Sequence, residues 1–232
     1  DGNLRYKVNE IELSRLKGKK ITKIARRSKF LIFEIGKTYQ MLVHLGMTGK
    51  FFFINNNDNK FKTSFYYHLD YKKDRKHNRV IFFLNKKQKL IYNDVRKFGF
   101  IKIYNRNSIN KSQHLTHLGP EPLEKNWNFL YLKKFITGRM RSIKNTLMDQ
   151  KCVSGLGNIY VNEILFFSGI KPQRKVSSLK NFEIQKIIKF SKKILKNSIK
   201  LGGSTIKDFS SENGKKGVFQ QHFKVYGREN QE

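Results

Sequence analysis

Acidic residues, cysteine and long apolar runs are all scarce in this 232-residue sequence, and each scarcity excludes a class of protein. The single cysteine, Cys152, excludes an internal disulfide and any metal site built from several cysteines. No apolar run approaches the length of a membrane span, and the first residues show no signal-peptide pattern. We therefore expect a folded protein of a reducing, cytoplasmic compartment, with no membrane partner.

The shortage of acidic residues leaves a large positive charge. Lys and Arg number 49 against 17 Asp and Glu, which gives a formal net charge of +32 at pH 7. A field of this sign indicates a polyanionic partner, which is usually nucleic acid and otherwise a membrane surface, and here it favours nucleic acid. Runs such as NNNDNK (55–60) and KKDRK (72–76) are typical of solvated loops, so part of this charge carries no information about the partner.

The distribution of apolar residues predicts two structural halves. Short β-branched and aromatic segments recur through the first hundred residues, separated by Gly, Asn and Lys clusters, at 21–35, 39–46, 50–54, 65–71, 79–84, 89–93 and 98–104. This spacing predicts an antiparallel sandwich or barrel. From about residue 108 the pattern becomes helical, at 126–142, 142–150, 153–172 and 177–203, and a short strand-like segment follows at 223–227.

One predicted helix, at 153–172, begins unusually, with Gly155 and Gly157 followed by Asn158. Glycine permits positive φ and close approach of another backbone or a ligand. Asn is a good N-cap, and a helix start presents N–H groups to an anion. The segment is therefore interpreted either as an anion site or as a glycine-rich turn between two packed helices.

Six motifs then occur in register. They are HLGMTG (44–49), DVRKFG (94–99), HLGPEPL (117–123), LMDQKCVSGLGNIYVNEILF (147–166), GGSTIKDF (202–209) and VYGREN (225–230). Together they resemble the formamidopyrimidine-DNA glycosylases, bacterial enzymes that excise oxidised purines and then nick the strand. The resemblance runs in order from residue 1 to about 230. It implies an α+β fold with a β-sandwich domain (1–107), then a helix–two-turn–helix domain (108–232), and DNA bound between them.

The resemblance also assigns contacts with the DNA backbone. It implies that Gly155, Gly157 and Asn158 hold phosphates near the lesion, with Arg139 and Lys144 as cationic partners. Such contacts position a duplex without reading its sequence. His68 matches a histidine that contacts the DNA backbone, although a histidine among strand aromatics is more commonly structural.

Three further residues match the side chains that fill the space left by a flipped base. Met47 matches a flexible probe, and methionine is unbranched and polarizable. Arg96 offers a planar fork to the orphaned cytosine, while Phe98 wedges the neighbouring base step. The trio favours this family over its relative endonuclease VIII. Without the resemblance, Met47 is equally well interpreted as a core residue at a strand end.

Lys29 matches an active-site lysine that donates a proton in the elimination step. A lysine in an apolar strand can have a lowered pKa and exchange protons near neutrality. The alternative is a lysine whose ammonium reaches solvent from a strand. The segment 202–217 resembles the loop that closes over the flipped base and contains Thr205 and Lys207; the alternative is a plain surface loop.

The sequence departs from the family at both ends. The family's nucleophile is an N-terminal proline followed by glutamate, whereas this sequence starts with Asp1 and Gly2 and aligns about thirty residues inside the family pattern. The family's first helix and first strand are also missing, as is its four-cysteine zinc finger. We therefore expect no cofactor in this chain, and we expect DNA binding with little or no excision by these 232 residues alone.

Three functions remain open at this stage. The first is a glycosylase and abasic-site lyase that acts, as a monomer in the bacterial nucleoid, on duplex DNA carrying an oxidised purine or an abasic site. The second is a catalytically silent module that binds DNA or lesions. The third is an RNA- or ribosome-binding protein, which fits the charge but not the probe trio or Lys29.

Overall fold

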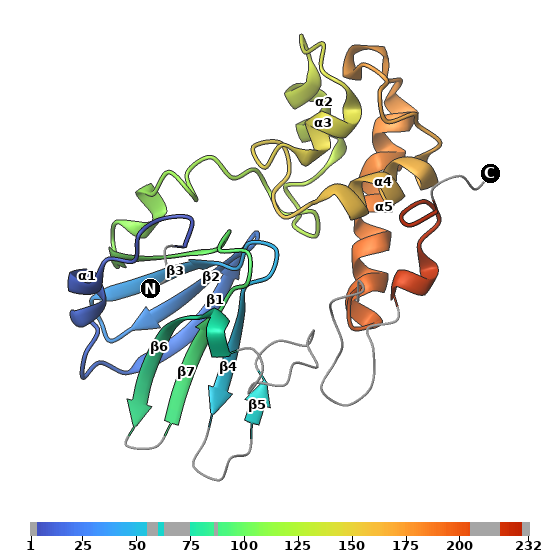
Figure 1. Cartoon of the computed structure of the whole chain (residues 1–232). Helices are drawn as coiled ribbons and strands as arrows, with labels where there is room; N and C mark the ends of the chain where they lie inside the picture. Colours follow the sequence, from blue (N-terminus) through green and yellow to red (C-terminus); the bar gives the residue numbers. More distant parts are fainter. Residues whose placement is uncertain (1–3, 55–59, 63–74, 86–87, 205–218, 229–232) are drawn as a thin grey trace. The chain divides into compact units, whose positions relative to one another are not determined.

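The computed structural model of this chain describes residues 4–54, 60–62, 75–85, 88–204 and 219–228 (Figure 1). They form two compact units, a β unit that reaches Leu115 and a helical unit that begins at Thr116. The predicted fold class, antiparallel sheets followed by helices, is confirmed. Among the helices of the described part, none has the length and apolar character needed to cross a membrane.

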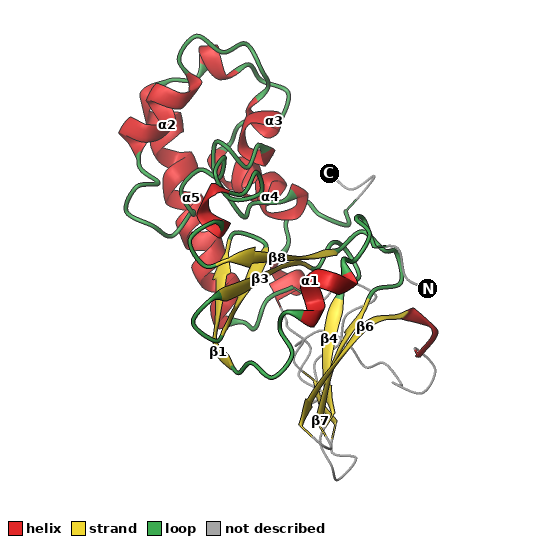
Figure 2. Ribbon diagram, turned by 90° about the vertical axis from the view of Figure 1, so that its left-hand side faces the viewer, coloured by secondary structure: helices red, strands yellow, loops and turns green. Residues whose placement is uncertain are grey.

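Within the described residues, the β unit contains two four-stranded antiparallel sheets, in the orders β1-β2-β3-β8 and β5-β4-β7-β6. The strands are β1 Ile21–Arg27, β2 Phe30–Ile35, β3 Tyr39–His44, β4 Lys50–Ile54, β5 Lys60–Lys62, β6 Asn78–Asn85, β7 Gln88–Asn93 and β8 Phe100–Asn105. Three short helices accompany them: α1 Glu10–Ser14, η1 Arg75–His77 and η2 Ile109–Lys111. In Figure 2 the strands of the two sheets run in different directions.

The two sheets share one apolar core, which makes the unit a sandwich. Their buried side chains, from β2, β3 and β8 on one side and β4 and β7 on the other, are Phe33, Ile35, Met41, Val43, Ile101, Phe51, Leu90 and Tyr92. β-branched and aromatic side chains suit such a pleated, half-buried surface. Strand β3 pairs with both β2 and β8. In this register His44, at the end of β3, lies opposite Phe30 of β2 and Phe100 of β8.

The division between the units lies after Leu115, later than the boundary expected after residue 107. The reason is a small cluster in which Ile109 packs with Leu42 and Phe100, with Leu115 against it. These contacts attach the segment after β8 to the β unit, so the helical unit starts only at Thr116.

The described part of the helical unit packs four α-helices around its own core. They are α2 Phe129–Ile136, α3 Ile143–Met148, α4 Asn158–Ser168 and α5 Asn181–Lys200, with short helices η3 Val176–Ser178 and η4 Phe219–His222. The long helix α5 turns an apolar stripe that includes Ile184, Ile187 and Ile194 to the core, whereas Phe182 and Ile199 of the same helix are exposed. Trp127 lies fully buried in the same core, and its indole N–H donates to Ser191 Oγ at 2.8 Å.

The strand-like segment predicted at 223–227 is not a strand. Its backbone N–H groups at Lys224, Val225 and Tyr226 donate to the carboxylate of Glu163 on α4, at 2.8, 3.0 and 3.0 Å. Glu163 is 1% exposed, and a buried carboxylate needs such partners. A contact more than sixty residues away in sequence therefore decides the local backbone.

Candidate functional site

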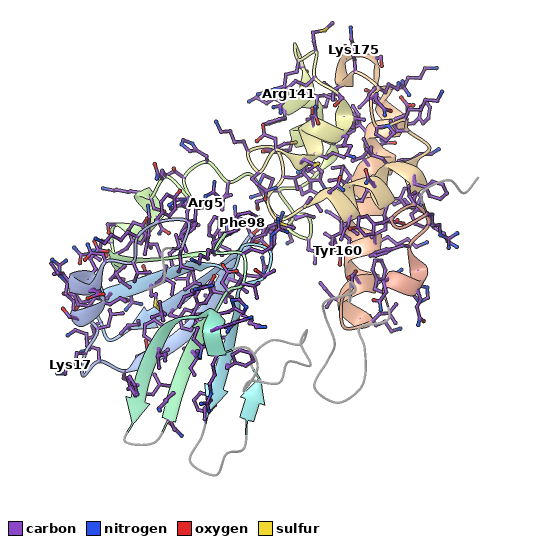
Figure 3. The ribbon with its side chains drawn as sticks, viewed as in Figure 1. Arg5, Lys17, Phe98, Arg141, Tyr160 and Lys175 are labelled. Atoms are coloured by element: carbon purple, nitrogen blue, oxygen red, sulfur yellow. The ribbon has the colours of Figure 1, made fainter. Side chains whose placement is uncertain are left out.

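A pocket of about 830 Å³ opens on the β unit where four chain segments meet. These are the N-terminal segment, the β1–β2 turn, the end of β3 with the loop after it, and the β7–β8 loop; the lining residues are Leu4, Arg5, Lys29, His44, Gly46, Met47, Arg96, Lys97 and Phe98. Four of them are Lys or Arg, and none of these nine is acidic. Figure 3 shows Arg5 and Phe98 at one end of the β unit. This composition suits an anionic ligand.

Lys29 lies in the tight turn between β1 and β2, and not within a strand as the apolar pattern suggested. Ser28 before it adopts a left-handed conformation with φ of 54°, and Arg26 Nη1 donates to Ser28 O at 2.8 Å, which holds the turn. Although Lys29 as a residue is exposed, desolvation by the surrounding protein lowers the pKa of its ammonium. A lysine of this kind can release a proton more readily than an ordinary one.

His44 is a pocket residue that the sequence reasoning missed. The Gly46 N–H donates to His44 Nδ1 at 3.1 Å, so in the neutral ring Nε2 is assigned the proton. Burial lowers the pKa of His44, and the charges of Lys29 and Arg5 lower it further. The motif HLGMTG, which starts at this histidine, was the available signal.

The structure brings Met47, Arg96 and Phe98 together at this pocket. Met47 and Phe98 are 59% and 48% exposed, although both are large and apolar. The Arg96 guanidinium lies over the Phe98 ring, 4.7 Å from its centroid, in a cation–π contact. Exposed apolar side chains beside a stacked arginine fit insertion between nucleic-acid bases.

The two loops that hold this trio touch through their backbones. Gly46 has φ of +64°, and a Cβ at this position would lie only 2.7 Å from Gly99 N. The glycines of HLGMTG and DVRKFG therefore allow an approach that larger residues would block. This approach places Met47 beside the loop of Arg96 and Phe98.

The helical unit presents the start of α4 with no side-chain cap. Gly157 is the N-cap residue, and Asn158 is the first helical residue and is exposed, so the expected capping role of Asn158 is wrong. A glycine cap leaves first-turn N–H groups available to an anion, with the positive end of the helix dipole behind them. The Asn158 side chain is available to donate to a phosphate.

Gln150 shapes the turn before α4, and the sequence reasoning did not single it out. Its Oε1 accepts from Gly155 N at 2.8 Å, and its Nε2 donates to Leu156 O at 2.9 Å. Gly155 has φ of 94°, which favours glycine. Gln150 therefore fixes how the chain enters the helix, and its place in the motif LMDQKCVSGLG was the available signal.

Arg139 and Lys144 lie in the same helical unit as this turn. Arg139 is exposed after α2, and its Nε donates to Phe135 O at 2.6 Å while its guanidinium lies 4.2 Å from the Phe135 ring centroid. Lys144 lies half-buried on α3.

Burial and the Asp149 charge raise the pKa of Cys152 in the turn to about 12, so this thiol stays protonated at neutral pH.

The remaining predicted site residues, His68, Thr205 and Lys207, lie outside the described residues. Within the described part, no group of three or more His, Cys, Asp or Glu side chains could hold a metal ion. The described residues therefore do not fit the zinc ion of the family's finger.

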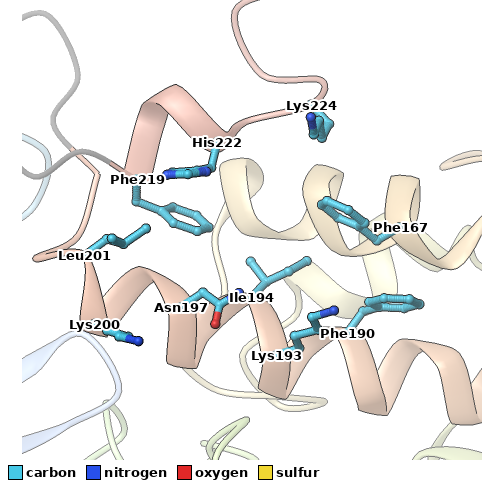
Figure 4. Close-up of a pocket in the computed structure, with 10 residues that line it drawn as sticks. All are labelled: Phe167, Phe190, Lys193, Ile194, Asn197, Lys200, Leu201, Phe219, His222 and Lys224. Atoms are coloured by element: carbon cyan, nitrogen blue, oxygen red, sulfur yellow. The ribbon is translucent and has the colours of Figure 1, made fainter.

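A second pocket, of about 440 Å³, lies between α4, α5 and η4 of the helical unit (Figure 4). Its floor is apolar and includes Ile194 and Phe219, and Lys193, Lys200 and Lys224 also line it. None of the predicted site residues lines this pocket.

Comparison with known proteins agrees with this geometry in both units. Residues 1–101 match the formamidopyrimidine-DNA glycosylase N-terminal domain, and residues 118–210 match the H2TH domain of the same family. The formamidopyrimidine-DNA glycosylase of Rhodopseudomonas palustris strain TIE-1 is 36% identical over 98% of this chain and 79% of its own length. That of Rickettsia felis is 38% identical, over 99% and 78%.

Solved structures show the same fold. A complex between Lactococcus lactis Fpg and DNA with an abasic site matches with a TM-score of 0.78 and 32% identity, over 94% of this chain and 74% of that one. A complex of inhibited LlFpg with N7-benzyl-Fapy-dG DNA matches with a TM-score of 0.80 and 30% identity, over 96% and 76%.

The fold, the cationic pocket and these relatives define a DNA glycosylase of base excision repair. The chain belongs to the formamidopyrimidine-DNA glycosylase family.

Proposed function

We propose that this protein excises oxidised purines, chiefly 8-oxoguanine and formamidopyrimidines, from duplex DNA and then cleaves the strand at the abasic site. The observation that carries the proposal is one cationic pocket that contains Lys29 together with Met47, Arg96 and Phe98. Solved complexes of similar proteins with abasic-site DNA and with a Fapy-dG lesion support the choice of ligand.

Recognition begins when the damaged base leaves the stack, since the reacting carbon is inaccessible inside a duplex. Met47 enters the vacated space, Arg96 donates to the orphaned cytosine, and Phe98 wedges the neighbouring step. The helical unit holds the phosphates through Gly155, Gly157 and Asn158, with Arg139 and Lys144 as cations. His68, Thr205 and Lys207 keep their predicted roles at the backbone and the flipped base.

The chemistry needs an amine nucleophile. Its nitrogen bonds to C1′ as the damaged base departs, and opening of the sugar gives a Schiff base; β- and δ-elimination then release the two phosphates. Lys29 supplies a proton during elimination, which its lowered pKa favours. In the family pattern the amine is that of an N-terminal proline followed by glutamate, and residues 1–232 contain no such pair at their start.

Borohydride trapping on a duplex with 8-oxoguanine opposite cytosine tests this proposal. The 232-residue chain is compared with the same chain extended at its N-terminus by the family's first residues, with undamaged duplex as the control. We expect a covalent complex only with the extended chain and only on damaged DNA. The absence of trapping by both chains, with intact binding, would instead favour a catalytically silent lesion-binding module.

Trapping of the 232-residue chain alone would show that another amine, with Lys29 first in line, is the nucleophile.

The proposed reaction uses no cofactor and a single copy of the protein on the duplex. We propose that the protein acts on chromosomal DNA in the nucleoid of a bacterial cell. Competition of abasic duplex by structured RNA at stated salt distinguishes an RNA-binding function.

A further inference from the structure

One hydroxyl group joins the two loops that present the proposed probes. Thr48, next to Met47, donates from Oγ1 to Asp94 Oδ1 at 2.5 Å. The same oxygen accepts from the backbone N–H of Arg96 at 3.0 Å. The Thr48 hydroxyl is thus both donor and acceptor between loop 45–49 and loop 94–99.

Asp94 ties the second loop at both of its ends. The carboxylate is fully buried, and its Oδ2 accepts from Gly99 N at 2.9 Å and from Tyr92 OH at 3.4 Å. Burial, and then the Asp94 charge, raise the pKa of Tyr92, so its hydroxyl remains a donor. A carboxylate is buried at low cost only when such donors surround it.

The base of each loop is therefore fixed while its tip is open. Asp94 is 0% exposed, whereas Met47 and Phe98 are 59% and 48% exposed. Thr48 is the residue after Met47, and its hydroxyl binds the Asp94 carboxylate and the Arg96 backbone N–H. These hydrogen bonds do not involve the exposed side chains themselves. Recognition side chains work best when a second layer of hydrogen bonds holds the backbone that carries them.

We propose that Thr48 and Asp94 are positioning residues for base recognition: their hydrogen bond holds Met47 against Arg96 and Phe98, and the preference for cytosine opposite the gap depends on it. This inference rests on the proposed function of the trio. It concerns specificity, since neither Thr48 nor Asp94 lines the pocket.

The experiment measures binding of the full chain to duplexes with a stable abasic-site analogue opposite cytosine or adenine, and to intact duplex. Thr48→Val removes both hydrogen bonds of the hydroxyl, and Thr48→Ser retains the hydroxyl. Thr22→Val is the matched control in the same unit, because it deletes an exposed threonine hydroxyl that donates to Glu34 O at 3.3 Å. Thermal unfolding of every variant defines a temperature at which all are folded.

We expect the ratio of the adenine to the cytosine dissociation constant to fall about tenfold in Thr48→Val, which corresponds to about 1.4 kcal/mol. Thr48→Ser and Thr22→Val should stay within about twofold of the parent. Affinity for intact duplex should be unchanged, because phosphate contacts dominate it. Amide exchange at Arg96 should accelerate in Thr48→Val alone.

Two failures are distinguishable. If the parent binds abasic and intact duplexes equally, the proposed function fails and the positioning role fails with it. The parent can instead bind the abasic duplexes more tightly than the intact duplex. If a folded Thr48→Val then keeps the parent's ratio of the adenine to the cytosine dissociation constant, only the positioning role is overturned. Should Thr48→Val be unfolded, Asp94→Asn replaces it under the same criteria, because it removes the charge that the three donors share.

Discussion

Lys29 shows how a single residue acquires a property that its type does not supply. Its turn places it at a pocket with Arg5 and His44, and desolvation lowers the pKa of its ammonium. The same positive charges lower the pKa of His44, after burial. Both shifts favour the neutral forms of Lys29 and His44.

Competitive acetylation across pH, read by mass spectrometry, tests the state of Lys29. Because only the neutral amine reacts, Lys29 should become reactive at lower pH than a lysine reference peptide. His44→Ala serves as a comparison, since removal of a neighbour that is neutral at such pH should leave the direction of the shift unchanged. Reactivity at the same pH as the reference peptide would show that the turn does not desolvate the ammonium.

The same shift has a consequence for stability. The folded pKa of Lys29 lies below its ordinary value, so between the two the unfolded chain binds more protons. The contribution to stability is complete above the ordinary pKa and is lost as pH falls through the folded value. In the parent protein this pH dependence of stability should be small, because Lys29 is exposed. In Lys29→Met it should disappear.

Sequence reasoning found four members of the β-unit site, missed His44, and did not find the hydrogen bonds that hold the site together. The family resemblance assigned Lys29 to proton donation and Met47, Arg96 and Phe98 to the space left by the base, and all four line one pocket. The turn at Lys29 was missed because a left-handed Ser28 leaves no signal in an apolar run. Hydrogen bonds between separate loops are likewise invisible in the pattern.

The N-terminus of α4 is the element on which the proposed phosphate contacts depend. Gly155 should tolerate alanine poorly, since an L-residue with φ of 94° is strained, at a cost of about 1–2 kcal/mol. Because Gln150 holds this backbone, the strain should shift the start of the helix. We expect Gly155→Ala to weaken binding to intact duplex and to reduce the salt slope of log K by up to about 0.9, the value of one phosphate.

Gly169→Ala is the matched control at the opposite end of the same helix. Gly169 also has positive φ, 70°, and a Cβ there would meet nothing within 4 Å. Both variants should lose similar stability in thermal unfolding, but only Gly155→Ala should lose DNA affinity. Equal losses of affinity would mean that binding depends on the stability of α4 and not on its N-terminus.

At the scale of elements, periodicity predicted α5 and most strands, whereas long-range partners decided the exceptions. The segment 223–227 alternates like a strand, yet three of its N–H groups bind Glu163 on a distant helix. The N-cap of α4 is Gly157, whereas the capping preference of Asn would place the cap at Asn158. The turn before the helix, which Gln150 holds, makes the helix start one residue earlier than that preference suggests. Neither partner can be identified from local composition.

The molecule as a whole combines a large positive charge with two separate cores. The cationic pocket of the β unit accounts for part of the +32 charge, and Arg139 and Lys144, which we propose as phosphate contacts, add to it in the helical unit. The described core clusters of the two units share no residue. Each unit therefore has its own source of hydrophobic stabilisation.

Separate cores predict separate unfolding transitions, which the single tryptophan can report. Trp127 is buried in the helical core together with Ile164, whereas Met41 is buried in the sandwich. Ile164→Ala should lower the stability seen by Trp127 fluorescence by about 2–5 kcal/mol. Met41→Ala should cost a similar amount in the amide exchange of β3 and leave the Trp127 transition in place. If Met41→Ala shifts the Trp127 transition equally, the units unfold as one cooperative body, and the proposed lesion pocket and the proposed phosphate site then have the same free energy of unfolding.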